Sequence, residues 1–190
     1  MVVAISDYGT EIPSGTGITQ IFYLLERRLQ RLSCGLTFLR SAEHMHNWKR
    51  QLPAILNSGV LASMHQPVTK IFPTVHARDV GLIAADLLLS PPTDQATPRT
   101  VYAEGPWHYT ALDVAEAIAL AIGREVKAKE LPRAEWENTL IQAGASARAA
   151  ALIAELYEAH NSGRIEVVQG CEVRRGTTSL GDVFRKMHNY

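Results

Sequence analysis

Cysteine, net charge and long apolar runs are all scarce in this sequence. Only two of its 190 residues are cysteine, so at most one disulfide can form and no disulfide framework supports the fold. Lysine plus arginine and aspartate plus glutamate each total 19, which leaves no formal net charge at pH 7. Because proteins that bind nucleic acid through phosphate contacts need a basic excess or stripe, this balance argues against a nucleic-acid partner.

The apolar residues are plentiful but dispersed. They make up 46% of the chain and charged residues 20%, which is the profile of a soluble globular protein. No apolar run approaches the roughly 20 residues that cross a bilayer, and residues 1–5 are too short for the core of a signal peptide. We therefore expect no membrane span and a location in the reducing cytoplasm.

Two short apolar runs flank an amphipathic segment near the start of the chain. Residues 2–5 and 36–39 are typical of buried strands. From residue 18 to residue 32, apolar residues recur at spacings of three and four, as on one helix face, and Gly35 stands where a helix stops. This order predicts two neighbouring parallel strands joined by a helix in a right-handed crossover.

The rest of the chain is mostly helical. We expect helices over 77–89, from Thr110 to Gly123, from Pro132 to Gly144, over 145–163 and from Ser179, a mixed segment at 45–61, strands at 70–72 and 101–105, and a proline-rich loop at 90–100. Asp113 and Asp182 stand where a capping box needs them, and Asp79 is expected to cap its helix. Few strands accompany these helices, so we expect the sheet to be incomplete on its N-terminal side.

Several stretches of the chain carry a resemblance to a known family. "GLTFLRSAEHMHNW" and "FPTVHARDVGLIAADLLL" resemble the NmrA-like family of atypical short-chain dehydrogenase/reductases, close to its NAD(P)H:quinone oxidoreductase branch. His46 stands where that family often has glutamate. "YAEGPWHYTALDVAEAIALAIGREVKAKELPRAEW" and "VRRGTTSLGDV" are similar to later family segments, so the resemblance covers essentially residues 2–190.

The resemblance implies an α/β fold in two parts. Residues 1–75 would be a truncated, Rossmann-like parallel sheet and residues 76–190 a smaller helical C-terminal substrate domain. Family members begin with a strand and a glycine-rich turn that holds the cofactor pyrophosphate at a helix N-terminus. Gly9, Gly15 and Gly17 have a different spacing, typical of a surface loop. The first strand resembles the family's fifth, so we expect roughly 100 residues of βαβ units to be missing.

Two loops after the first two strands are similar to the wall around the nicotinamide ring in this family. Ligands bind at the carboxyl ends of strands in such sheets. The resemblance implies NAD(P) contacts from Ser6 and Tyr8 after the first strand, and from Arg40, Ser41 and Glu43 after the second. For Arg40, a structural ion pair is the alternative role.

The same resemblance implies the residues that meet the substrate. Trp48 and His44 would line the substrate pocket, although Trp48 also suits a core anchor at the sheet edge. Tyr23 is the candidate catalytic residue because it precedes Arg27 in a Tyr-x-x-x-Arg spacing, where the wider dehydrogenase group has Tyr-x-x-x-Lys. A packed aromatic is the alternative for Tyr23, since core-forming positions flank it.

Metal and thiol chemistry have little support in the sequence. His44 and His46 stand beside Glu43, but a zinc site usually needs three or four ligands and no further ligand is identifiable. We therefore expect no metal. Cys34 follows a helix among apolar neighbours and is expected to be unreactive.

Two functions stay open on this reading. The first is an NAD(P)-linked oxidoreductase-type protein acting on a quinone or similar carbonyl, which binds NAD(P) weakly or not at all by itself and is inactive alone because the phosphate site is missing. The second is a non-catalytic redox-sensing or regulatory interaction protein. In both cases the open sheet edge is expected to pair with a second copy or a partner chain.

Overall fold

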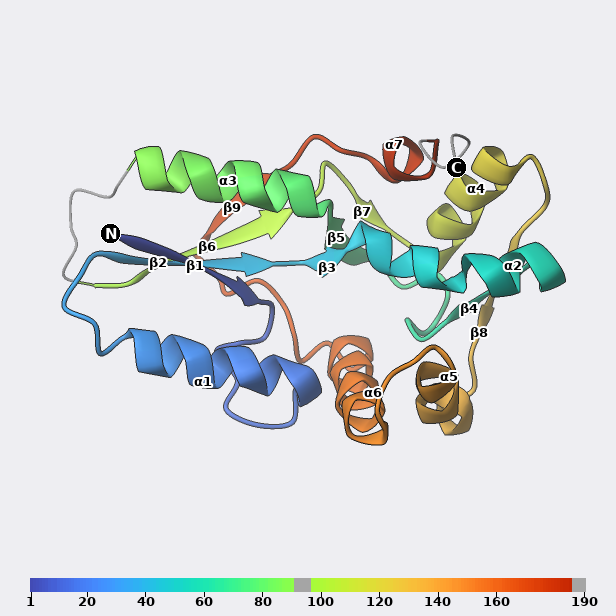
Figure 1. The fold of residues 1–190 in the computed structure, drawn as a ribbon, viewed down its shortest axis with the longest axis horizontal. Coiled ribbons are helices and arrows are strands. Elements are labelled where there is room, and N and C mark those ends of the chain that lie inside the picture. Colours follow the sequence, from blue (N-terminus) through green and yellow to red (C-terminus); the bar gives the residue numbers. More distant parts are fainter. Residues whose placement is uncertain (91–96, 186–190) are drawn as a thin grey trace.

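A parallel sheet of four strands forms one end of the molecule. The computed structural model describes residues 1–90 and 97–185. The strands follow the order β1 (Val2–Asp7), β2 (Leu36–Ser41), β6 (Arg99–Glu104) and β9 (Glu172–Arg175), and each neighbouring pair is parallel (Figure 1). The two neighbouring parallel strands predicted from the sequence are confirmed, in a register that runs from Val2 opposite Leu36 to Asp7 opposite Ser41.

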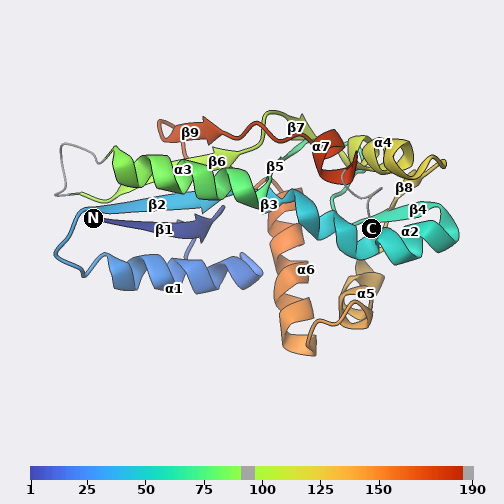
Figure 2. The same ribbon diagram turned by 45° about the horizontal axis from the view of Figure 1, so that its top comes forward.

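Two helices cover opposite faces of this sheet beside β1. Helix α1 (Gln20–Leu29) lies on one face and α3 (Ala77–Leu89) on the other, and both contact β1 (Figures 1 and 2). The apolar core lies mainly on the α3 side, where Leu39, Val101 and Leu87 are buried. On α1 only Glu26 is buried, so this helix leaves much of its apolar surface exposed.

The remaining elements form a mainly helical part at the other end (Figure 1). They are the parallel strand pair β4 (Val60–Ser63) and β8 (Lys127–Glu130), the helices α2 (Leu52–Ser58), α4 (Ala111–Ile122), α5 (Trp136–Gln142) and α7 (Leu180–Arg185), and the 3-10 segments η2 (Met45–Gln51) and η3 (Arg133–Glu135). Helix α6 (Ala147–Asn161) lies between the two parts, against the 3-10 turn η1 (Gly17–Thr19) (Figure 2).

A small three-stranded sheet links the two parts. It consists of β3 (Glu43–His44), β5 (Phe72–Val75) and β7 (His108–Tyr109). Strand β3 continues the chain just beyond β2, so it carries residues from the carboxyl end of the main sheet toward the helical part. Strand β6 of the main sheet and helix α3, which packs on that sheet, both lie beyond residue 75. The predicted division of the chain into two domains at residue 75 stays a prediction.

Two helix starts follow the chemistry that the sequence indicates. Thr110 and Asp113 form a complete capping box at the start of α4. Before α7, the backbone N–H of Asp182 donates to Ser179 Oγ at 3.2 Å, and the Ser179 N–H donates to Asp182 Oδ2 at 3.1 Å. Both predicted caps are therefore confirmed.

Two local expectations are wrong. Helix α1 ends at Leu29, six residues before Gly35, whose carbonyl instead accepts from the N–H of Val2. His76 caps α3, while the carboxylate of Asp79 accepts from the backbone and hydroxyl of Thr178, because the chain before α7 passes over the first turn of α3. Cys34 is exposed beyond the end of α1, and its expected lack of reactivity stays a prediction.

The other predicted elements are found with shifted bounds. The strand expected at residues 70–72 begins at Phe72 and runs to Val75, and the helix expected from Pro132 begins at Trp136 after a 3-10 turn. Residues 91–96 of the expected proline-rich loop lie outside the described residues. Within residues 1–90 and 97–185, no helix has both the length and the apolar character needed to cross a membrane.

Gly17 of η1 lies directly against the backbone of α6, with no room for a side chain. Its φ is +58°, and a Cβ there would lie 1.9 Å from the carbonyl oxygen of Leu152. We expect Gly17→Ala to lower the free energy of unfolding by roughly 3 kcal/mol or more, from left-handed strain plus overpacking. Gly144 is the matched control, because its φ is +96° but no atom lies within 4 Å of the added Cβ. We expect Gly144→Ala to lower the free energy of unfolding by about 1–2 kcal/mol, from backbone strain alone. Urea unfolding curves that show equal losses would contradict this packing.

Candidate active site

The carboxyl end of β1 rests on a buried charge network. Glu26 of α1 accepts from Ser6 Oγ at 2.6 Å, from Arg40 Nε at 3.1 Å and from Arg40 Nη2 at 2.9 Å. Arg40 Nη1 donates to the hydroxyl of Tyr102 at 3.0 Å and to Glu11 at 2.6 Å. The structural ion pair weighed for Arg40 is therefore present. Ser6 and Arg40 lie inside this network, and their contact with a cofactor stays a prediction.

Tyr8 points into a second buried cluster, at the end of β6. Its hydroxyl donates to Glu104 Oε1 at 2.8 Å, and the other carboxylate oxygen of Glu104 meets His108 Nε2 at 2.8 Å and Arg175 Nη1 at 2.9 Å. Burial, followed by the charge of Glu104, raises the pKa of Tyr8. The phenol therefore stays protonated at neutral pH, and its cofactor role stays a prediction.

Ser41, the last residue of β2, and His44 of β3 lie side by side. Ser41 Oγ donates to the carbonyl of Ala42 at 2.9 Å and lies 3.0 Å from His44 Nε2. Since the one hydroxyl proton of Ser41 is used by Ala42, the imidazole donates through Nε2 in this arrangement. Burial, with help from the nearby His46, lowers the pKa of His44, so the ring is neutral at physiological pH.

Glu43 is the centre of a third cluster, built from three distant parts of the chain. Its Oε1 accepts from the hydroxyl of Tyr157 at 2.9 Å, and its Oε2 lies 2.8 Å from His65 Nε2. Burial alone would raise the pKa of Glu43, but the hydrogen bond and charge of His65, with the bond from Tyr157, outweigh it and hold the pKa below its usual value. Glu43 is therefore an anchored carboxylate.

The histidines of this cluster are held in defined states. Because the Glu43 carboxylate can only accept, His65 presents an N–H at Nε2. Its Nδ1 is buried without a hydrogen-bond partner, and its ring stacks on Phe72 with centroids 3.8 Å apart. Burial, followed by the charge of His65, lowers the pKa of His160 to about 4, so His160 is neutral.

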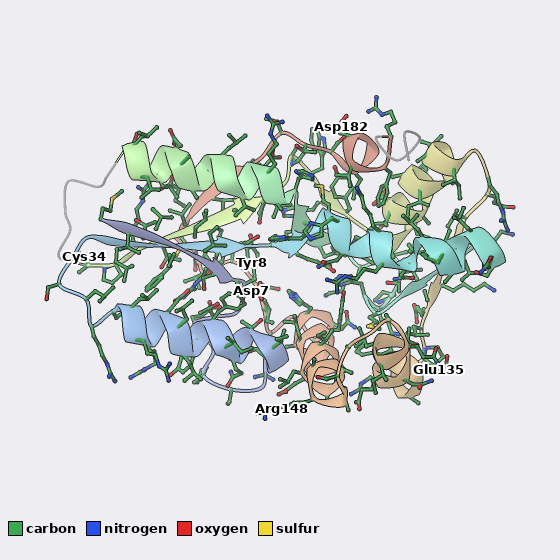
Figure 3. All side chains as sticks on the ribbon, in the orientation of Figure 1. Asp7, Tyr8, Cys34, Glu135, Arg148 and Asp182 are labelled. Atoms are coloured by element: carbon green, nitrogen blue, oxygen red, sulfur yellow. The ribbon has the colours of Figure 1, made fainter. Side chains whose placement is uncertain are left out.

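Asp7 ends β1 and faces the same edge of the sheet as Glu43. Its carboxylate accepts from the N–H of Tyr8 at 2.9 Å and from the hydroxyl of Thr19 at 3.1 Å. Burial raises the pKa of Asp7 to about 6, against those two bonds, and the charge of Glu43 adds to the rise. Figure 3 shows Asp7 and Tyr8 at this edge, with Cys34 at the opposite end of the sheet.

Asp7 and Glu43 therefore form a pair of carboxyl groups whose pKa values are shifted in opposite directions. Asp7 is the last residue of β1, and Glu43 lies two residues beyond the end of the neighbouring strand β2. Their environments push the two pKa values apart: up for Asp7 and down for Glu43. Such a separation is typical of acid and base pairs in active sites. At physiological pH the pair offers one group poised to exchange a proton and one fixed negative charge.

Trp48 and Tyr23 do not contact the Asp7, Ser41 or Glu43 side chains through any hydrogen bond in the described part of the chain. Trp48 is buried in the helical part and stacks on Phe72 with centroids 5.9 Å apart, as a core anchor does; its substrate role stays a prediction. Tyr23 lies on α1, where its hydroxyl accepts from Arg27 Nη1 at 3.4 Å. Its catalytic role likewise stays a prediction.

Sequence reasoning missed His65, Tyr157 and His160. They are separated from Glu43 by 22 residues or more along the chain, and no local motif joins them. The one available signal was on α6, where Tyr157 and His160 are three residues apart and share a helix face. Asp7 had a clearer signal, since it stands just beyond the predicted strand at residues 2–5, between the candidate residues Ser6 and Tyr8.

The glycine loop after β1 does not fit a dinucleotide pyrophosphate. Gly17 packs on the backbone of α6, and a Cβ on Gly9 would lie 2.8 Å from Ile165. Arg164 donates to the carbonyls of Ser14 and Gly15, both at 3.1 Å. The loop is thus filled by this chain's own atoms, whereas a pyrophosphate needs free backbone N–H groups at a helix start.

We also searched the described part of the chain for a metal site and for a ligand pocket. Within residues 1–90 and 97–185, no group of three or more His, Cys, Asp or Glu side chains is placed to hold a metal ion. An open, mainly apolar hollow of about 510 Å³ lies between α4 and β8, away from Asp7 and Glu43. We place the candidate site at Asp7 and Glu43 because they lie at the carboxyl ends of the main-sheet strands, where such folds bind their ligands.

Comparison with known proteins shows the fold. No family model matches the sequence, and no curated protein matches it. An NADPH-dependent quinone oxidoreductase from Escherichia coli superposes with a TM-score of 0.78 at 18% identity, over 98% of this chain and 67% of that one. A triphenylmethane reductase from Citrobacter sp. gives 0.74 at 17% identity, over 99% and 64%. A nucleoside-diphosphate-sugar epimerase from Staphylococcus aureus gives 0.74 at 16% identity, over 96% and 63%.

The chain shares a Rossmann-like fold with these structures. The predicted α/β class, with a parallel sheet and flanking helices, is therefore confirmed. Further structures of the first two proteins hold NADPH and NADP(H), respectively. This chain spans about two thirds of the length of these proteins, so their activities reach it only as proposals.

The raised pKa of Asp7 predicts a specific pH dependence of stability. The folded chain holds a proton on Asp7 up to about pH 6, whereas the unfolded chain releases it near 3.8. The Asp7 contribution to the free energy of unfolding therefore falls as pH rises from about 4 to 6, by about 2 kcal/mol after allowance for partial solvent screening. Relative to wild type, Asp7→Asn is expected to gain this amount between pH 4 and 7.

Urea unfolding of both proteins at several pH values tests this expectation. Only the difference between the two proteins is informative, because His160, with a lowered pKa, changes the stability of both in the opposite direction over this range. A difference that stays constant with pH would show that Asp7 has an ordinary pKa.

The bond from Tyr157 to Glu43 predicts a cost for removing one hydroxyl. Tyr157→Phe leaves an oxygen of the anchored carboxylate without this donor, which is expected to lower the free energy of unfolding by about 1.5–3 kcal/mol. Tyr23→Phe is the matched control: its hydroxyl makes an exposed contact, so the change is expected to stay within about 0.5 kcal/mol. Similar losses in both variants would argue against the buried Glu43 cluster.

Proposed function

We propose that this chain is the substrate-side part of an NmrA-like, NAD(P)-linked oxidoreductase-type protein that acts on a quinone or similar carbonyl. The observation that carries the proposal is the Asp7–Glu43 pair at the carboxyl edge of a parallel sheet, where such folds bind their ligands. The likeness to an NADPH-dependent quinone oxidoreductase over 98% of the chain supports it.

The proposed chemistry uses Asp7 as a proton donor. Reduction of a quinone or carbonyl leaves negative charge on the acceptor oxygen, and a proton must neutralise it. An acid with a pKa near the working pH transfers that proton efficiently, and Asp7, at about 6, meets this condition. Transfer breaks the O–H bond of Asp7, forms an O–H bond on the acceptor, and leaves a carboxylate that water reprotonates.

The negative charge of Glu43 would help to keep the carboxyl group of Asp7 protonated. The carboxylate of Glu43 disfavours a second negative charge nearby, which supports the protonated form of Asp7. Tyr157 and His65 hold Glu43 through both of its oxygens. Ser41 and His44, just beyond β2, would line the side of the site where the nicotinamide ring and substrate meet.

The chain by itself is proposed to be inactive. Its glycine loop is packed with its own side chains, so the cofactor phosphates lack backbone donors there. We expect calorimetry to show no NADPH binding in the low micromolar range, equivalent to about −8 kcal/mol, and a steady-state assay to show no NADPH-dependent reduction of a simple quinone. Low-micromolar binding by the chain alone would overturn this part of the proposal.

A fusion protein tests the chemistry separately. The dinucleotide-phosphate part of the E. coli quinone oxidoreductase, joined ahead of this chain, is expected to restore NADPH binding and quinone reduction. Asp7→Asn in the fusion should lower the rate by about 100-fold or more, the usual scale of general acid catalysis. Glu166→Gln, at an exposed position, is the control and should leave the rate unchanged. A fusion that binds NADPH without reducing quinones, or an unaffected Asp7→Asn, would refute the proposed role.

A further inference from the structure

The two oxygens of the Asp7 carboxyl group have different kinds of hydrogen-bond partner. Oδ1 accepts from the backbone N–H of Tyr8 at 2.9 Å, and Oδ2 accepts from the hydroxyl of Thr19 at 3.1 Å. A backbone N–H can only donate, whereas a hydroxyl can turn and accept. When Asp7 is neutral, its proton is therefore best placed on Oδ2, where Thr19 can accept it, while Oδ1 keeps its bond to Tyr8.

The hydroxyl of Thr19 pairs with Asp7 alone. Thr19 is fully buried, and within residues 1–90 and 97–185 its hydroxyl has no hydrogen-bond partner other than Asp7. A hydrogen bond donated to a carboxylate is roughly twice as strong as one between neutral groups. Thr19 therefore favours the ionised form of Asp7, in opposition to the burial and the charge of Glu43 that favour the neutral form.

Helix α6 holds Thr19 in place. The 3-10 turn η1 ends at Thr19 and packs on α6 through Gly17. The same helix carries Tyr157, whose hydroxyl donates to Glu43 at 2.9 Å. One helix thus supports both carboxyl groups of the candidate site: Glu43 directly, and Asp7 through η1.

We propose that Thr19 is the positioning residue of Asp7: its hydroxyl accepts the proton of the neutral acid at Oδ2 and donates to the carboxylate that remains after proton transfer. When the Oδ2–H bond breaks, its electron pair stays on Oδ2 and the proton forms an O–H bond on the acceptor oxygen. Thr19 then turns its own proton toward Oδ2. The use of this pairing in catalysis rests on the proposed function, whereas its effect on Asp7 does not.

Several other titratable or charged groups belong to the elements around the end of β1. They are Tyr8, Glu11, Glu26, Arg40, Glu43 and His44. Of these, Glu43 acts on Asp7 through its charge, and Arg40 binds both Glu11 and Glu26. A substitution of Thr19 alters none of these side chains, so the titration of Asp7 in Thr19 variants reports on the lost hydroxyl.

Carbon-13 NMR titration of the Asp7 carboxyl group in the 190-residue chain tests this proposal, with Asp7→Asn to assign the signal. Thr19→Val removes the hydroxyl and should raise the pKa of Asp7 by roughly one pH unit, because the lost bond favours the ionised form. Thr19→Ala should give a similar rise, and Thr19→Ser, which keeps a hydroxyl, should restore the wild-type value. Thr37→Val is the matched control: the Thr37 hydroxyl is buried without a hydrogen-bond partner, so no change is expected.

A pKa of Asp7 that is unchanged or lower in folded Thr19→Val would overturn the proposal, and so would an equal rise in Thr19→Ser or Thr37→Val. Circular dichroism establishes that each variant is folded.

The fusion protein separates this result from the proposed function. Asp7 must be protonated to act as an acid, so the rate falls as the pH rises through its pKa. In the Thr19→Val fusion this fall is expected to move to higher pH by the same amount as the titration. A shifted titration with an unshifted rate profile would support Thr19 as the partner of Asp7 and refute Asp7 as the catalytic acid.

Discussion

The buried pair of Glu26 and Arg40 is the contact on which the main sheet depends. Glu26 is the one buried residue of α1, and through it the helix is tied to Arg40 on β2 and to Ser6 on β1. Removing Arg40 would leave the charge of Glu26 buried without a counter-charge, which typically costs 3–5 kcal/mol. On the α1 face of the sheet, this ion pair lies beside the buried side chains of Leu36 and Phe38, which precede Arg40 on the same side of β2.

The contacts of Glu26 and Arg40 also position the residues of the candidate site. With β1 and β2 fixed in parallel register, Asp7 and Ser41 lie opposite each other at the strand ends, and Glu43 follows directly. The burial that raises the pKa of Asp7 and the partners that lower the pKa of Glu43 both come from segments that pack against this edge.

The likeness to reductases and an epimerase with 16–18% identity shows how little local sequence the fold requires. The three proteins named in the comparisons act on different molecules, because function in such folds resides in side chains at the strand ends. In this chain those side chains are an aspartate, a glutamate and the partners of each. The substrate-side proposal therefore depends on these residues, and the fold gives only their position.

Periodicity and capping chemistry were enough to predict the parallel pairing of residues 2–5 with 36–39, the start of α4 at Thr110 and the α/β class, because these depend on residues close together in the chain. Sequence alone placed the end of α1 and the role of Asp79 wrongly, since a contact from Thr178, 99 residues away, decides the latter. It also missed the convergence of His65 and Tyr157 on Glu43. Only tertiary structure decides burial, and burial sets both the pKa values at the site and the apolar surface left on α1.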